Sequence, residues 1–272
     1  IRQLRIDGFT LGEITTKTGL SKTTIFHHIK FIPRSDILKA KIREISRTLQ
    51  KQQADFRRGK SVKNYIFKRP KKWTPDYVNL MSHFLFDGRI THATCLYYNR
   101  NKILIDNIIF NMKKILDIDD YKIYQDKNNV TRLAYHNVEV ASFVRQKSTE
   151  LLEYILSSSF KEKIAFLKSF FDDEGCIDFK ITKNRREVRG YQHSLEILNI
   201  IHALLEDVGI RGVIDKKYFE IVISKKDNLL KFQKFINFTP GVTVNGARSN
   251  SIWKKSLEKR EILKMAINSY LN

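Results

Sequence analysis

The chain has 272 residues, 42% of them hydrophobic, which is enough for two domains and a sizeable core. It carries 50 lysines and arginines against 29 acidic residues, a net charge of +21 that is typical of nucleic-acid-binding proteins. A ribosome-like or membrane-surface protein is the lesser alternative. No apolar run approaches the roughly 18 residues of a membrane span, so we expect no membrane partner. Two cysteines without CxxC spacing favour a reduced, cytoplasmic protein.

Residues 1–32 predict a helix-turn-helix. Thr10 and Ser21 are suited to cap two short helices, Gly19 supplies the tight turn between them, and Leu20 is expected to fill the core. Ile25 and Ile29, four residues apart, then face inward. The outer face of the second helix, which would enter a DNA major groove, holds Lys22, Thr23, His27 and Lys30. The alternative is a small helical hairpin used for protein contacts.

Residues 33–73 predict a basic helical linker. Within 34–72 there are 14 basic and 3 acidic residues, a net 14 − 3 = +11. A helix beginning at Ser35-Asp36 is expected to have an apolar stripe made of Leu38, Ile42, Ile45 and Leu49. Arg57 and Arg58 belong to a basic cluster that favours contact with the DNA backbone. The alternative is a solvated charged spacer.

The remainder reads as one order of elements used twice. The hydrophobic periodicity predicts a helix at 77–86, strands at 89–92 and 93–98, a helix at 102–116, strands at 121–125 and 131–136, and a helix at 137–155. The second half predicts a helix at 161–173, strands at 175–182 and 187–192, a helix at 195–208, strands at 213–217 and 219–224, and a helix at 225–236. A last helix is expected at 252–270, capped by Ser251.

The first helix of each half ends at an acidic residue followed by glycine. The two runs are Leu80-Met-Ser-His-Phe-Leu-Phe-Asp-Gly88 and Leu167-Lys-Ser-Phe-Phe-Asp-Asp-Glu-Gly175. Their glycines are expected at positive φ. Asp87 and Glu174 then lie at the negative end of a helix dipole, where two carboxylates repel and raise a pKa unless a divalent cation binds them. The small residues Ser82 and Ser169 would let the two helices approach closely. The alternative is a pair of helix caps on solvent-exposed turns.

This pattern resembles the LAGLIDADG homing endonucleases in their monomeric, two-motif form, over residues 74–270. The resemblance implies an α+β fold: two pseudo-symmetric αββαββα repeats, 74–158 and 159–272, with saddle-shaped antiparallel sheets beside the small all-α N-terminal domain. It also implies that Asp87 and Glu174, at the eighth motif letter, are the catalytic acids and hold Mg²⁺ or Mn²⁺. The chain departs from the motif at Phe86 and Asp173, where a small residue is usual, and at Leu85.

Strand alternation assigns residues to the DNA face. Ile177, Phe179 and Ile181 are expected inward, which turns the three intervening polar residues outward. The residues expected to face DNA are Arg89, Thr91, Lys122, Asp178, Lys180 and Thr182. Lys161 and Arg248 are candidates for the basic group that assists catalysis in the family, or for contacts to phosphates.

The function that these observations favour is site-specific double-strand DNA cleavage by a monomer on a long pseudo-palindromic target, with a role in intron mobility. A non-cleaving helix-turn-helix transcription regulator that uses the same fold as a DNA scaffold is the first alternative. An intron RNA maturase is the second.

Overall fold

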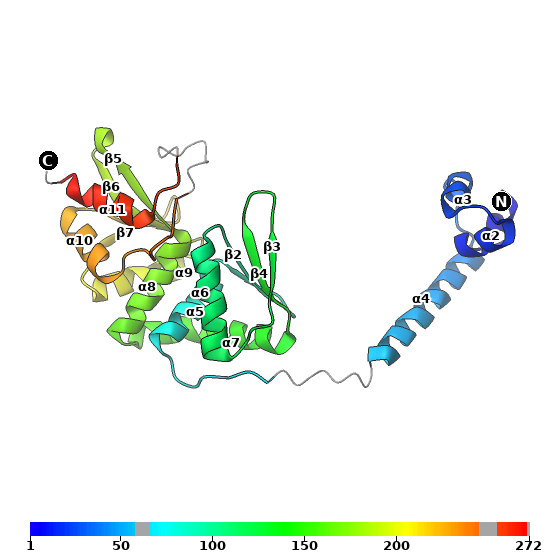
Figure 1. The fold of residues 1–272 in the computed structure, drawn as a ribbon, viewed down its shortest axis with the longest axis horizontal. Coiled ribbons are helices and arrows are strands. Elements are labelled where there is room, and N and C mark those ends of the chain that lie inside the picture. The colour runs from blue at the N-terminus through cyan, green and yellow to red at the C-terminus, as the bar shows by residue number, and fades with distance from the viewer. Residues whose placement is uncertain (58–65, 245–254, 271–272) are drawn as a thin grey trace. The chain divides into compact units, whose positions relative to one another are not determined.

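A computed structural model describes residues 1–57, 66–244 and 255–270 of the chain, with side chains described outside 53–65. The chain divides into two compact units, Ile1–Tyr65 and Ile66–Asn272 (Figure 1). The first unit therefore extends beyond residue 32, where the sequence suggests that the helix-turn-helix ends.

Four helices make up the first unit: α1 (Arg2–Ile6), α2 (Leu11–Thr18), α3 (Lys22–Ile29) and α4 (Asp36–Arg57). Thr10 caps α2 in a capping box with Glu13, and Gly19 ends α2 at a φ of 69°. Ser21 accepts a hydrogen bond from the backbone N–H of Thr24 and caps α3. The expected caps and turn are therefore present, and the loop between the two helices is as short as the sequence indicates.

The core of this unit differs from expectation at Leu20. That side chain is 41% exposed. The buried residues Ile14, Ile25 and Ile29 are covered instead by partly buried apolar residues outside the α2–α3 turn, namely Ile1, Leu4, Phe9, Leu11 and Ile32. The core of the first unit is therefore completed by residues before, within and after the two helices, and not by the residue of the turn between them.

Helix α4 begins where the sequence predicts, but only the first part of its apolar stripe is buried. Leu38 is fully buried, whereas Ile45 is 44% and Leu49 52% exposed. The start of α4 is tied to α2 by an ion pair of 2.5 Å between Lys41 Nζ and Glu13 Oε1. The three preceding helices are too short to cover the later turns of a 22-residue helix.

The second unit contains two repeats with the same order of elements. The first comprises α5 (Pro75–Phe86), β1 (Gly88–Ile90), β2 (Cys95–Asn99), α6 (Lys102–Asn111) continued by the π-turn η1 (Met112–Leu116), β3 (Lys122–Gln125), β4 (Thr131–Tyr135) and α7 (Val138–Tyr154). After the turn η2 (Ile155–Ser157), the second comprises α8 (Phe160–Glu174), β5 (Gly175–Lys180), the turn η3 (Ile181–Lys183), β6 (Arg185–Tyr191), α9 (Leu195–Asp207), β7 (Gly212–Asp215), β8 (Glu220–Ile223) and α10 (Lys226–Phe235).

Both sheets are antiparallel and have equivalent strand orders, β1-β2-β4-β3 and β5-β6-β8-β7. Helices α5 and α8 pack against each other, and the two sheets lie on either side of this pair (Figure 1). The predicted αββαββα order is therefore confirmed in both halves. On each sheet one face packs against helices, with Tyr97 and Leu133 buried in the first sheet and Val188 and Ile221 in the second.

Two predicted elements end or begin elsewhere. Strand β5 stops at Lys180, and Ile181, expected inward, is 63% exposed in a 3₁₀ turn. The turn closes at Asn184 with a φ of 48°, which breaks the strand alternation two residues early. The terminal helix α11 (Lys259–Asn268) has Glu258 as its N-cap, so the described part of 252–270 is helical only from Lys259. Ser251 lies outside the described residues.

None of the helices in the described ranges is long and apolar enough to span a membrane.

Candidate active site

The two acid-glycine pairs lie at the C-terminal ends of α5 and α8. Asp87 is the C-cap residue of α5, and Glu174 is the last residue of α8. Neither Gly88 nor Gly175 has a positive φ, contrary to expectation. A Cβ on Gly88 would lie 2.0 Å from the carbonyl oxygen of Phe84, and one on Gly175 2.3 Å from that of Phe171. Glycine is needed because each strand leaves directly over the last turn of its helix.

The serines of the two motifs lie in the packed helices. Ser82 and Ser169 are both fully buried. The Asn79 side chain donates to Ser169 Oγ at 2.7 Å, and Ser169 Oγ lies 3.2 Å from the Asn79 carbonyl. Ser82 donates to the carbonyl of Val78 in its own helix. At Ser169 the backbone of α5 is thus within hydrogen-bonding reach of α8.

The helix pair has two unlike flanks. On one flank, His83 Nδ1 lies 2.7 Å from Asp173 Oδ2, with both side chains buried. The motif alignment relates His83 to Phe170 and Asp173 to Phe86. On the other flank, the rings of Phe86 and Phe170 meet edge to face at 5.2 Å. The two departures from small residues at the seventh motif letter are therefore each matched by the fourth letter of the partner helix.

Asp173 connects this flank to the motif acids. Its Oδ1 accepts hydrogen bonds from Tyr97 Oη at 2.6 Å and, more weakly, from Asn99 Nδ2 at 3.4 Å. The same Asn99 amide donates to Asp87 Oδ2 at 3.0 Å. Tyr97 and Asn99 both come from β2, whose alternation places them on the helix-facing side. The sequence did not single out either residue, because their role depends on strand register.

The motif carboxyls are difficult to ionise. Burial, followed by the charges of Asp173 and Glu174, raises the pKa of Asp87 to about 8. Burial and the charge of Asp173 raise the pKa of Glu174 to about 7. Burial lowers the pKa of His83, but the charge and hydrogen bond of Asp173 more than offset it, so the net pKa is raised. The acids of both repeats thus share one electrostatic environment.

A buried lysine closes the end of α8. Lys259 Nζ donates to the carbonyls of Asp172 at 2.7 Å and Phe171 at 3.3 Å. Burial lowers its pKa, against the opposing charges of Asp172 and Asp173. The Asp172 carboxylate is in turn occupied by the backbone N–H and hydroxyl of Thr239, at 2.7 and 2.6 Å. This lysine was not predicted, because it lies 85 residues beyond Glu174 (259 − 174) and outside any motif.

The donor chemistry of Asp87 and Glu174 suits a hard divalent cation. Both acids supply carboxylate oxygens, and a cation would relieve the repulsion that raises the two pKa values. Among the described residues no group of three or more His, Cys, Asp or Glu side chains is arranged to hold a metal. A cation at this pair would therefore take its remaining ligands from water and phosphate oxygens.

The sheet faces opposite the helices carry most of the residues expected to meet DNA. Arg89 and Lys122 stand at the two ends of one row, which runs through Leu96 and Ala134. Asp178 and Lys180 lie on the corresponding face of β5, where Asp178 Oδ2 pairs with Arg185 at 2.8 Å.

Two of the expected DNA-facing residues are not in strands. Thr91 lies in the turn after β1, where its N–H bonds to the Thr94 carbonyl and its own carbonyl accepts from Arg145. Thr182 is exposed in the turn η3. In both cases the strand ends earlier than the run of β-branched residues suggests.

Lys161 is in the first turn of α8, at the opposite end from Glu174, so it does not contribute to the acid pair. Lys22, Thr23 and His27 of α3 and its C-cap residue Lys30, the four residues of the expected recognition face, are all exposed. The side chains of Arg57, Arg58 and Arg248 lie outside the described residues.

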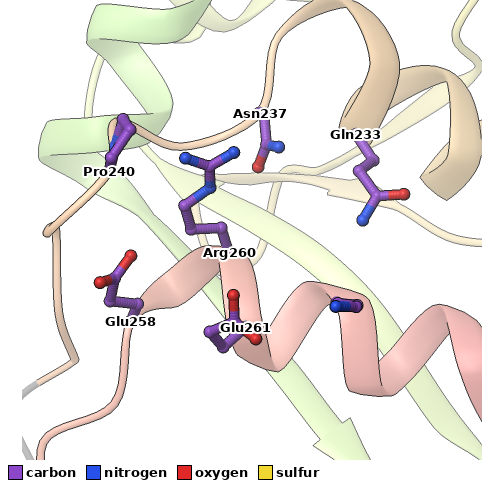
Figure 2. A pocket seen from close by; sticks show the side chains of 7 residues that line it. Gln233, Asn237, Pro240, Glu258, Arg260 and Glu261 are labelled. Atoms are coloured by element: carbon purple, nitrogen blue, oxygen red, sulfur yellow. The ribbon is translucent and has the colours of Figure 1, made fainter.

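A shallow pocket of about 400 Å³ lies between α10, the loop after it and the start of α11 (Figure 2). Arg260 and Glu258 point into it from the start of α11 (Figure 2). Its lining mixes both signs of charge and includes neither Asp87 nor Glu174. The candidate catalytic groups thus lie at the helix ends and not in this pocket.

Comparison with known proteins agrees with this architecture. A family model described as LAGLIDADG-like domain matches residues 161–237. No curated protein matches the chain. The structure resembles the homing endonuclease I-DmoI in complex with DNA and Mn at 18% identity and a TM-score of 0.45, covering 60% of this chain and 96% of that one.

Two further solved structures are similar. The N-terminal LAGLIDADG domain of DUF199/WhiA is 14% identical with a TM-score of 0.46, over 62% of this chain and 86% of that one. Full-length DUF199/WhiA from Thermatoga maritima is 11% identical with a TM-score of 0.45, over 74% and 63%. Together with the repeated element order and the equivalent sheets, the family match shows that the chain has the LAGLIDADG fold and that its residues 161–237 form a LAGLIDADG-like domain.

Proposed function

We propose that the chain is a site-specific, divalent-metal-dependent DNA endonuclease that cuts both strands. The observation that carries this proposal is the pair Asp87 and Glu174: they occupy the same position in two related repeats, and the charge of Glu174 helps to raise the pKa of Asp87. A protein that only bound DNA would gain nothing from two poorly ionised carboxylates beside phosphates. The solved complexes of the similar protein I-DmoI with DNA and Mn agree with this proposal.

The chain's own residues give the site its shape. Asn99 orients Asp87 by donating to Oδ2, and Lys259 fixes the end of α8 by donating to its last carbonyls. When bound between the two acids, a Mg²⁺ or Mn²⁺ ion would supply Lewis-acid stabilisation of phosphate oxygens and a more acidic water. One acid from each repeat gives the site the pseudo-twofold arrangement that two antiparallel DNA strands require.

The proposed partner is duplex DNA, bound by the chain as a monomer. The net charge of +21 provides the attraction, and each sheet presents a free face to one half of a pseudo-palindromic target. The exposed recognition face of α3, with its C-cap residue Lys30, would add a contact from the N-terminal unit in the major groove.

The test separates binding from cutting. The target is first selected from a library of randomised duplexes by binding, and the selected duplex is then incubated with Mg²⁺. We expect the unaltered chain to cut both strands, whereas Asp87→Asn and Glu174→Gln bind the same duplex with nearly unchanged affinity and do not cut both strands. Cleavage that survives in the double variant Asp87→Asn/Glu174→Gln would refute the assignment of the acids.

A non-cleaving DNA-binding regulator is the second candidate. It is favoured by the N-terminal unit, where two capped helices joined at Gly19 present Lys22 and His27 to solvent. The same experiment distinguishes it: a regulator selects a duplex, depends on α3 for that selection and leaves the DNA intact with Mg²⁺ or Mn²⁺.

A further inference from the structure

The free face of the first sheet carries positive charge without compensation. Strands β1 to β4 contain no acidic residue. Arg89, Lys122 and Arg132 share the face opposite the helices, giving it a charge of +3. None of the three forms an ion pair within the described part of the chain. The Arg132 guanidinium stacks 4.3 Å over the Tyr124 ring, and its Nε has no hydrogen-bond partner among the described residues.

The free face of the second sheet is charged quite differently. It carries three cations, Lys180, Arg185 and Arg189, and four acids, Asp178, Glu187, Asp215 and Glu220, for a net 3 − 4 = −1. Most of these side chains are paired with one another.

Arg189 is the centre of that network. Its Nε and Nη2 donate to Glu187 Oε2 at 2.9 and 2.6 Å, and its Nη1 donates to Glu220 Oε1 at 2.6 Å. The three side chains are only 15–25% exposed. Three of the five guanidinium N–H groups are therefore engaged and the plane is fixed, which leaves one N–H on each Nη for another acceptor.

These faces interact differently with DNA. Uncompensated cations bind phosphates on any sequence, whereas carboxylates on a surface repel phosphates. A guanidinium held in one plane, with one N–H left on each Nη, can match O6 and N7 of guanine, and a neighbouring carboxylate can accept from N4 of cytosine. A pair of Arg189 with Glu187 or Glu220 is thus complementary to one G·C base pair and unfavourable beside bare phosphate.

We propose that the two sheets divide the work: the first anchors the DNA backbone, and the second reads the sequence, with Arg189 as the specificity-determining residue for a G·C pair. The inference rests on the proposed DNA-binding function but is independent of cleavage.

The test compares two charge-altered variants without divalent metal, on a random-sequence duplex and on the selected target. Arg89→Gln/Lys122→Gln removes two phosphate contacts, so we expect weaker binding to both duplexes and a salt slope reduced by about 1.8. Glu187→Gln/Glu220→Gln removes the repulsion, so we expect severalfold tighter binding to the random duplex and a smaller preference for the target.

Arg189→Gln tests the base contact. Repeating the duplex selection with this variant is expected to abolish the preference for G·C at one position in the half-site of the second sheet, which corresponds to a loss of about 5- to 150-fold in discrimination. Thermal unfolding checks that each variant is folded, and Glu220→Gln alone replaces the double variant if that one is not.

The outcomes separate the two proposals. If the unaltered chain shows no salt-dependent binding to any duplex, DNA binding itself is refuted. If it binds but Glu187→Gln/Glu220→Gln leaves random-duplex affinity unchanged or lowers it, or if Arg189→Gln selects the same bases, the division of work between the sheets is refuted while DNA binding stands.

Discussion

At the scale of single residues, the buried pair of His83 and Asp173 explains why an acidic residue can occupy a motif position that is usually small. A carboxylate taken out of water needs a charged partner and further donors. His83 supplies the partner, and Tyr97 and Asn99 supply the donors. The sequence shows the departure at Asp173 but not its compensation, because the partner lies 90 residues away on another helix.

Replacing His83 tests this compensation. We expect His83→Phe to lower the free energy of unfolding of the second unit by about 3–5 kcal/mol, since Asp173 is left buried without its base. His83→Phe/Asp173→Asn should recover part of the loss, because an amide has no charge to bury. Urea denaturation followed by tryptophan fluorescence measures both. An equal loss in the two variants would contradict the ion-pair account.

Glu13 gives the first unit a pH-dependent contribution. Its hydrogen bonds from Lys41 and from the Thr10 backbone lower its pKa to about 2. Because the folded pKa lies below the ordinary value of 4.5, the stabilisation is complete above pH 4.5 and is lost as the pH falls toward 2. The protection factors of the α2 amides, which correct for the pH dependence of intrinsic exchange, should fall across this window. Glu13→Gln is the control and should show a flatter profile there.

At the scale of elements, the sequence predicts the order of helices and strands in both repeats because hydrophobic periodicity is local. Hydrophobic periodicity does not predict where an element ends when a backbone turn, and not the side-chain pattern, ends it. Ile181 continues the alternation of β5, yet the chain turns at Asn184 and leaves it exposed. The position of Asp87 and Glu174 at helix ends could be predicted from the sequence, whereas Lys259 reaches the end of α8 only through tertiary packing.

The glycines after the motif helices offer a prediction at this scale. Gly175→Ala should destabilise the second unit by about 1–3 kcal/mol, as overpacking does, because its Cβ would lie 2.3 Å from the Phe171 carbonyl oxygen. Gly12→Ala is the matched control: a Cβ there has nothing within 4 Å, and in the first turn of α2 the substitution should stabilise the first unit by about 0.4–1 kcal/mol. Differential scanning calorimetry measures both changes.

At the scale of the whole molecule, the chain has two compact units with separate cores. We therefore expect two unfolding transitions in calorimetry. Gly12→Ala should move only the transition of the first unit, and His83→Phe only that of the second. A single transition that both variants shift would show that the units unfold together.

Because the two flanks of the α5–α8 helix pair differ, two identical repeats could not form the same pair. Two copies of the first repeat would place His83 beside Phe86, and two copies of the second would enclose an unneutralised Asp173 beside Phe170 at each crossing. The motif helix of each repeat therefore packs well against the motif helix of the other repeat and poorly against a copy of itself. Such a chain has two unlike halves, as a heterodimer would. On the nearly symmetric duplex proposed as its target, it would therefore bind in one orientation only.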